Sequence, residues 1–300
     1  MLYAVIDIGS NAARLLFANA FVRDDEIFVE KASLIRIPLR LGKDVFSIGK
    51  VSKEKSKDLL KTMHAFKLLI EVYKPYKYKV LATAAMREAS NSKKLCRMIY
   101  ENTGLEIEVI SGKQEASIIR TTNKLNILNS SKPLVFIDVG GGSTEISVEF
   151  QDKLIQLRSF KIGTIRLLEE NYPSTIWEEI YSWLKEIRNK YPQMYCIGSG
   201  GNINKLNKLY GDSESQILTT DHLRTAFNHL GSLTVEERMK KFGFRRDRAD
   251  VIVPAANIYL KILDYLGASQ IRVPKIGLAD GMVHILHSDY LKNKSSIAIE

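Results

Sequence analysis

The 300-residue sequence has no long apolar run, only two cysteines and only seven prolines. No stretch reaches the roughly 18 consecutive apolar residues of a membrane-spanning helix, so an integral membrane protein is not indicated. Cys96 and Cys196 show no paired spacing, which gives no support to a disulfide framework or a structural zinc site. Met1 leads at once into the strand-like segment 2–8 without a basic leader, and we therefore expect a cytoplasmic protein.

What is present is the composition of a folded chain, with 45% hydrophobic and 26% charged residues. The length favours two domains of roughly 150 residues each. The net charge of +10 is uneven, because residues 1–125 hold 22 Lys and Arg against 14 Asp and Glu, while residues 126–300 hold 22 against 20. This asymmetry indicates an anionic partner for the first half, although the solvated face of a lysine-rich helix would produce it as well.

Short strand-like runs alternate with amphipathic segments, which predicts α/β architecture. Apolar residues at helical spacing predict a helix over 52–73, and we also expect helices over 202–210 and from about 279 to 292. Pro254 interrupts another apolar stretch, so we expect a kink or a helix start there. The polar segment 123–132 is the expected boundary. We therefore predict domains over 1–125 and 126–300, with the last helix free to pack back on the first domain.

Two segments share one layout, "AVIDIGSNAARLLF" from Ala4 and "FIDVGGGSTEISV" from Phe136, in which an apolar strand ends in an acid and a glycine turn. Asp7 and Asp138 begin the two turns, 131 residues apart. Glycines let backbone amides approach an anion closely, and successive amides form a phosphate cradle. The acids suit Mg²⁺, which prefers carboxylate, water and phosphate oxygens.

These turns define the first set of candidate site residues. Glycine turns are also common hairpin connections, but two matching copies favour a ligand with several phosphates. The candidate metal ligands are Asp7, Asp138 and Glu145, and the candidate phosphate-binding residues are Ser10, Asn11, Gly140, Gly141, Gly142, Ser143 and Thr144.

A third glycine turn lies in "YCIGSGGNINKLNKL", where an apolar strand meets a helix that we expect Asn202 to cap. A helix N-terminus with available amides is an anion site. A packing turn between strand and helix explains the same residues equally well. The candidate phosphate-binding residues here are Gly198, Ser199, Gly200 and Gly201.

Six segments in order then resemble the motif series of the exopolyphosphatase and guanosine pentaphosphate phosphatase family. They are "IDIGSNAARLL", "ATAAMREASN", "VISGKQEA", "IDVGGGSTE", "IGSGGNINKL" and "RADVI", and the resemblance spans residues 4 to about 285. That family belongs to the superfamily of acetate and sugar kinases, heat-shock chaperone ATPases and actin.

The resemblance implies two ribonuclease-H-like (actin-like ATPase) domains with the active site in the cleft between them. It also implies hydrolysis, dependent on Mg²⁺ or Mn²⁺, that releases the terminal phosphate of inorganic polyphosphate or the 5′ phosphate of pppGpp. Such a protein needs no nucleic-acid polymer and no membrane as partner, and a homodimer is left open. The sequence does not choose between the two substrates or set a chain-length preference.

The resemblance also assigns roles to single residues. Glu115 falls at the family's water-activating glutamate, and Arg87 at a phosphate clamp, with Arg14 as a second clamp. Two departures stand out. Gln114 replaces a frequent glutamate, and the frequent "LREG" is here Leu278, Ala279, Asp280 and Gly281.

Two other readings remain open at this point. One is a kinase of the same superfamily, which needs an acceptor pocket and a base that the sequence does not identify. The other is a non-catalytic regulator that binds pppGpp or ppGpp. The presence of Asp7, Glu115, Asp138 and Glu145 together argues against it.

Overall fold

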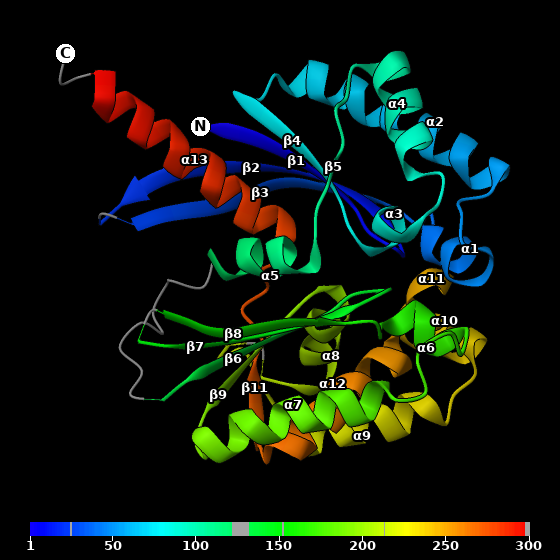
Figure 1. Ribbon diagram of the computed structural model, residues 1–300, viewed down its shortest axis with the longest axis vertical. Coiled ribbons are helices and arrows are strands. Elements are labelled where there is room, and N and C mark those ends of the chain that lie inside the picture. The colour runs from blue at the N-terminus through cyan, green and yellow to red at the C-terminus, as the bar shows by residue number, and fades with distance from the viewer. Residues whose placement is uncertain (25, 122–131, 152, 213, 298–300) are drawn as a thin grey trace. The chain divides into compact units, whose positions relative to one another are not determined.

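The computed structural model describes the chain except residues 25, 122–131, 152, 213 and 298–300. It divides into two compact units, Met1–Asn126 with Gly277–Glu300, and Ile127–Ile276. Each unit contains one mixed β-sheet (Figure 1). The boundary predicted over 123–132 lies almost entirely outside the described residues.

The first unit has a five-stranded sheet in the order β3-β2-β1-β4-β5. Strands β1, β2 and β3 form an antiparallel meander, while β4 and β5 continue parallel to β1. The strands are β1 (Leu2–Ile8), β2 (Ala13–Arg23), β3 (Glu26–Ile37), β4 (Lys77–Ala82) and β5 (Glu108–Val109).

The helices of the first unit come from both ends of the chain. α13 (Leu278–Ile297) packs on β1, β2 and β3 and on α5 (Gly112–Arg120) (Figure 1). The predicted helix over 52–73 is confirmed as α2 (Lys53–Tyr73), which buries Leu59, Met63 and Phe66. The remaining helices of this unit are α1 (Leu41–Ile48), α3 (Ala84–Glu88) and α4 (Ser92–Thr103).

The second unit has a six-stranded sheet in the order β10-β11-β9-β6-β7-β8. Its strands β6, β7 and β8 again form an antiparallel meander, and β9 and β11 continue parallel to β6. The strands are β6 (Leu134–Val139), β7 (Thr144–Phe150), β8 (Lys153–Phe160), β9 (Tyr195–Ser199), β10 (Ile217–Thr219) and β11 (Gln270–Arg272). The two sheets therefore share one topology, with β10 as an addition, and the predicted α/β class is confirmed.

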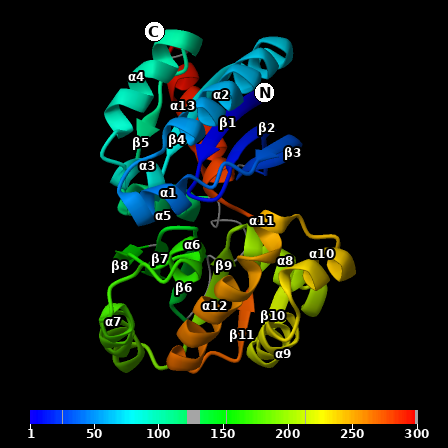
Figure 2. The same ribbon diagram turned by 90° about the vertical axis from the view of Figure 1, so that its right-hand side faces the viewer.

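The central helix of the second unit is α12 (Ile252–Leu266), which packs on β6 and contacts α6, α7, α8 and α9 (Figure 2). Pro254 is the third residue of α12, where a missing amide proton costs no intrahelical bond, so the predicted helix start is confirmed. The other helices are α6 (Thr164–Leu168), α7 (Ile176–Lys190), α8 (Gly201–Tyr210), α9 (Thr220–Gly231), α10 (Val235–Phe242) and α11 (Arg246–Ala249).

Two further predictions can be compared with the helices. The helix predicted over 202–210 is α8, but it begins at Gly201 with Gly200 at the cap position. The proposed cap at Asn202 is therefore wrong, because Asn202 already lies inside the first turn. Among the described residues, no helix combines the length and apolar character that crossing a membrane would require.

Candidate functional site

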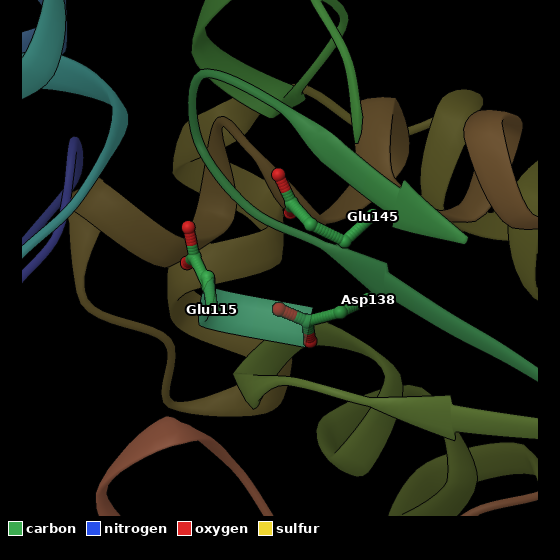
Figure 3. Close-up of side chains that lie close together, drawn as sticks. All are labelled: Glu115, Asp138 and Glu145. Atoms are coloured by element: carbon green, nitrogen blue, oxygen red, sulfur yellow. The ribbon is translucent and has the colours of Figure 1, made fainter. Parts of the chain in front are cut away.

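A row of polar side chains crosses the second sheet where β6 and β7 approach their connecting turn. Asp138 pairs in register with Glu145 on β7 and with Ser199 on β9, and Glu145 pairs with Ser159 on β8. Ser199 Oγ donates to Asp138 Oδ1 at 2.6 Å, and Ser159 Oγ donates to Glu145 Oε1 at 2.7 Å. The two flanking hydroxyls thus orient the two central carboxylates. Figure 3 shows the side chains of Asp138 and Glu145 on the two neighbouring strands.

Asp138 and Glu145 suit a divalent cation. Residues directly opposite on adjacent strands have Cβ atoms about 4.5–5.5 Å apart, and like charges at that spacing repel. A cation between the carboxylates removes this repulsion. The donor set is all oxygen, which is the set that Mg²⁺ prefers. Asp138 and Glu145 therefore fit the Mg²⁺ or Mn²⁺ ion that the family resemblance implies.

The glycine turn beside this row is clamped from one side. Gly140 O, Gly141 O and Gly142 O accept hydrogen bonds from the start of α6, namely from Thr164 N at 2.9 Å, Ile165 N at 2.8 Å and Arg166 Nε at 2.7 Å. In a planar trans peptide, the N–H of the next residue points opposite to the carbonyl. The amides of Gly141, Gly142 and Ser143 therefore point away from α6, which is the arrangement of an anion cradle.

The turn of the first unit repeats this construction. Gly9 N donates to Ala12 O at 3.0 Å, as Gly140 N donates to Ser143 O at 2.9 Å. Ser10 O accepts from Gly42 N at 2.8 Å and Asn11 O accepts from Arg40 N at 2.9 Å, so the helix after the third strand again holds the carbonyls. By the same peptide geometry, the amides of Asn11 and Ala12 face away from α1.

A glycine at the start of α1 and another just before α6 let these helices approach the turns closely. A Cβ on Gly42 would lie 2.9 Å from Ser10 Cβ, and a Cβ on Gly163 would lie 2.6 Å from the carbonyl carbon of Gly141. Gly42 is the second residue of α1 and Gly163 is the cap residue of α6, and each faces the second residue of its turn, Ser10 or Gly141. Neither glycine was predicted from the sequence, because neither belongs to the turn that it helps to hold.

The equivalent row in the first sheet has the opposite charge. Asp7 pairs in register with Arg14, and Arg14 pairs with Arg36 on β3. Arg14 Nη1 lies 2.8 Å from Asp7 Oδ2, so the carboxylate meets a guanidinium where Asp138 meets Glu145. Arg36 was not among the site residues predicted from the sequence. The metal-ligand role of Asp7 and the clamp role of Arg14 stay predictions, but the ion pair between them was not foreseen.

In the third glycine turn, one glycine permits close packing and another adopts a backbone conformation that favours glycine. A Cβ on Gly198 would lie 2.9 Å from Ile271 Cδ1, so this glycine permits close strand packing. Gly200 has φ of +104°, and its Cβ would lie 3.0 Å from Asp138 Oδ1. Arg248 Nη1 donates to Gly201 O and to Asn202 Oδ1. The phosphate-binding role predicted for Gly198, Ser199, Gly200 and Gly201 stays a prediction.

Glu115 and Arg87 lie close together in the first unit. Arg87 Nη1 donates to Ile110 O at 2.8 Å and lies 3.8 Å from Glu115 Oε2. Gln114 completes a capping box with Ser111, whose amide donates to Gln114 Oε1 at 2.9 Å. A glutamine serves as well as a glutamate in that motif, which explains this departure from the family pattern.

The second departure also has an internal role. Asp280, in the first turn of α13, is 7% exposed and lies 3.1 Å from Lys31 Nζ on β3. Burial raises the pKa of Asp280, and Lys31 partly offsets this effect. A Cβ on Gly281 would clash with Ile118 O, so α13 and α5 pack with almost no space between them.

Comparisons with known proteins agree with this arrangement. A sequence profile of the Ppx/GppA phosphatase family matches residues 32–288. A guanosine-5′-triphosphate,3′-diphosphate pyrophosphatase of Photobacterium profundum is 25% identical over 96% of this chain and 59% of its own length. A bifunctional 3-dehydroquinate synthase/phosphatase of Fusobacterium nucleatum is 25% identical over 89% of this chain and 44% of its own. The chain thus spans between two fifths and three fifths of these curated relatives.

Solved structures share the fold along nearly the whole chain. An exopolyphosphatase from Cytophaga hutchinsonii has a TM-score of 0.81 at 21% identity, covering 95% of this chain and 97% of its own. The Aquifex aeolicus member of the Ppx/GppA protein family has a TM-score of 0.73 at 26% identity, covering 98% of each chain. Since the profile match takes in most of the sequence, the chain belongs to the Ppx/GppA phosphatase family.

Proposed function

We propose that this protein is a divalent-metal-dependent phosphoanhydride hydrolase that releases the terminal phosphate of inorganic polyphosphate or the 5′ phosphate of pppGpp. The observation that carries the proposal is the pairing of Asp138 with Glu145 beside a glycine turn whose amides face away from α6. This combination provides a cation site and an anion cradle on one strand pair. Mg²⁺ or Mn²⁺ is the cofactor that this donor set suits.

The roles of the chain's own residues follow from phosphoryl-transfer chemistry, which asks for positioning and charge neutralisation. A cation held by Asp138 and Glu145 would neutralise charge on phosphate oxygens. The amides of Gly141, Gly142 and Ser143 would bind phosphate oxygens of the substrate. The guanidinium of Arg87 provides a planar set of donors for a phosphate, and its position 3.8 Å from Glu115 Oε2 holds the two side chains as a pair.

Glu115 is the proposed general base that takes a proton from the attacking water. Glu115→Gln keeps the side-chain volume and can still hydrogen-bond a water, but it cannot accept the proton. We expect kcat to fall on the order of 10²–10⁴-fold with little change in substrate affinity. Single-turnover phosphate release measures the loss. A variant that keeps more than about a third of the wild-type kcat would exclude Glu115 as the base.

Polyphosphate is the substrate that the charge distribution favours, because residues 1–125 carry an excess of eight positive charges. The relative named for a guanosine phosphate substrate is much longer than this chain, so its name alone does not assign that substrate to this chain. Both substrates therefore enter the test.

The experiment compares phosphate release from long-chain polyphosphate, tripolyphosphate, pppGpp and ATP, each in excess Mg²⁺ and in excess chelator. We expect release from polyphosphate or pppGpp that stops in chelator and in Asp138→Asn. The matched control is Tyr210→Phe, which removes a hydroxyl bonded to His229 in the same unit. Full activity in chelator would contradict the metal requirement. ATP consumption only with an added acceptor would instead indicate a kinase, and binding of pppGpp without turnover a regulator.

A further inference from the structure

Tyr259 of α12 places a phenol hydroxyl among backbone groups at the ends of β6 and β9. The side chain is 0% exposed and belongs to the core of the second unit. Its hydroxyl donates to Ser199 O at 2.6 Å and accepts from Val139 N at 3.3 Å. Ile137 O lies 3.4 Å away, but a hydroxyl has a single proton, and the shorter contact takes it.

These contacts surround Asp138 without touching its side chain. Ile137 and Val139 precede and follow Asp138 on β6, and Ser199 is its register partner on β9. Ser199 also donates its own hydroxyl to Asp138 Oδ1 at 2.6 Å. The phenol therefore joins the two strands that present Asp138 and its hydrogen-bond donor.

We propose that Tyr259 is a positioning residue for the cation site, which fixes the backbone on both sides of Asp138 and the strand that carries Ser199. The inference rests on the proposed function, because it takes Asp138 and Glu145 as the cation ligands. Tyr259 acts through Asp138 and Ser199 and does not itself contact the cation.

The surroundings of Tyr259 favour this role over simple filling of the core. A phenylalanine would fill the same volume, and a buried hydroxyl destabilises the fold unless it is hydrogen-bonded. α12 also buries Ile258, Leu260 and Ile262, and the hydroxyl of Tyr259 is therefore a polar group among buried side chains that are otherwise apolar. Burial first, and then the charges of Asp138 and Glu145, raise the pKa of Tyr259 well above 10, so the phenol stays a donor at any physiological pH.

The site leaves little room for displacement. Gly200 approaches so closely that a Cβ there would lie 3.0 Å from Asp138 Oδ1. Partners that hold metal ligands typically change metal affinity about 10–100-fold when they are removed. A small shift of β6 relative to β9 would move Asp138 Oδ1 against Ser199 and Gly200, and cation affinity is the property that reports it.

The test measures Mn²⁺ binding to the full chain by electron paramagnetic resonance, without substrate. We expect Tyr259→Phe to raise the Mn²⁺ dissociation constant about 10-fold. In turnover assays, kcat at low Mg²⁺ should fall and should recover at high Mg²⁺, while KM for substrate at saturating Mg²⁺ stays unchanged. Tyr210→Phe should bind Mn²⁺ like the wild type.

Two further variants separate the possible failures. Ser199→Ala removes the hydroxyl donor to Asp138 but keeps the carbonyl that Tyr259 uses, so it should also weaken Mn²⁺ binding, and it serves if Tyr259→Phe does not fold. If Asp138→Asn binds Mn²⁺ like the wild type, the cation site itself is wrong and the inference falls with it. If Asp138→Asn loses Mn²⁺ but a folded Tyr259→Phe keeps wild-type affinity, the proposed function stands and the positioning role is overturned. Where Tyr259→Phe does not fold, wild-type affinity of Ser199→Ala overturns the role, because Tyr259 is proposed to act through Ser199.

Discussion

One residue identity distinguishes the two duplicated strand pairs. Arg14 and Glu145 occupy the same position, each opposite the acid that ends the first strand of its sheet. Asp7 is neutralised by Arg14 at 2.8 Å, whereas Asp138 faces a second carboxylate. The charge of Asp7 is therefore already balanced without a ligand, whereas a cation would remove the repulsion between Asp138 and Glu145.

This difference predicts the behaviour of Glu145→Gln. The amide oxygen still accepts from Ser159 Oγ, but the repulsion of Asp138 disappears. Since such like-charge pairs cost about 0.2–1 kcal/mol, the metal-free variant should be as stable as the wild type or more stable by that amount. Thermal unfolding with and without Mg²⁺ measures the effect, and the stabilisation by Mg²⁺ should be lost. A variant that keeps the full Mg²⁺-induced shift would show that Glu145 is not a ligand.

Asp280 predicts a pH dependence of stability. Because burial raises its pKa in the folded state, the folded chain holds this proton more tightly than the unfolded chain does. Stability therefore falls as the pH rises above the ordinary carboxyl value of 3.8, up through the raised folded pKa. Asp280→Asn removes this loss, so its stability relative to the wild type should increase over that window and level off above it. Chemical unfolding at several pH values tests this, and a difference that does not change with pH would contradict it.

At the scale of elements, the sequence predicted the glycine turns but not what holds them. The turns can be recognised in the sequence because an acid is followed by glycines and small polar residues. Gly42 and Gly163 follow the third strand of each meander, far along the chain from the turns that they contact, and no local sequence signal marks them. Likewise, the sequence showed Arg14 but not its pairing with Asp7, which depends on the register of two strands.

Because the start of α6 packs on the glycine turn of the second unit, Gly163→Ala should displace that turn. Gly163 has φ of −158°, an extended conformation that alanine adopts readily, so the effect is purely steric. Its new Cβ would lie 2.6 Å from Gly141 C and O, and the turn must shift. Such overpacking typically costs about 1–3 kcal/mol, and we expect substrate affinity to fall together with stability.

The matched control for Gly163→Ala is Gly231→Ala, at the end of α9. A Cβ at Gly231 meets no atom of the described chain within 4 Å, so alanine should leave substrate affinity unchanged. Its helical position favours alanine over glycine by about 0.5–1 kcal/mol. Unfolding curves and substrate titrations of both variants are the measurement. Equal effects in the two variants would show that the close contact with Gly141 does not hold the turn.

At the scale of the whole molecule, the two similar segments whose acids lie 131 residues apart each supply the first two strands of a sheet, and the two sheets share one topology apart from β10. The return of α13 to the sheet of the first unit was only allowed for, because the periodicity of a helix shows that it has a buried face and not which sheet covers it. The contact of Gly281 with Ile118 O decides this by close packing, which a single sequence does not reveal.

The uneven charge of the chain predicts how binding depends on salt. Residues 1–125 carry eight more positive than negative charges, and residues 126–300 carry two more. A long polyphosphate can interact with many dispersed lysines and arginines, whereas tripolyphosphate contacts only the groups at the site. Screening acts over about 8–10 Å near physiological salt, so raising the salt weakens the distant interactions first. The apparent affinity for long-chain polyphosphate should therefore fall more steeply with ionic strength than that for tripolyphosphate, at fixed free Mg²⁺. Equal slopes for the two substrates would show that the basic residues of the first half are an ordinary solvated surface and do not gather the substrate.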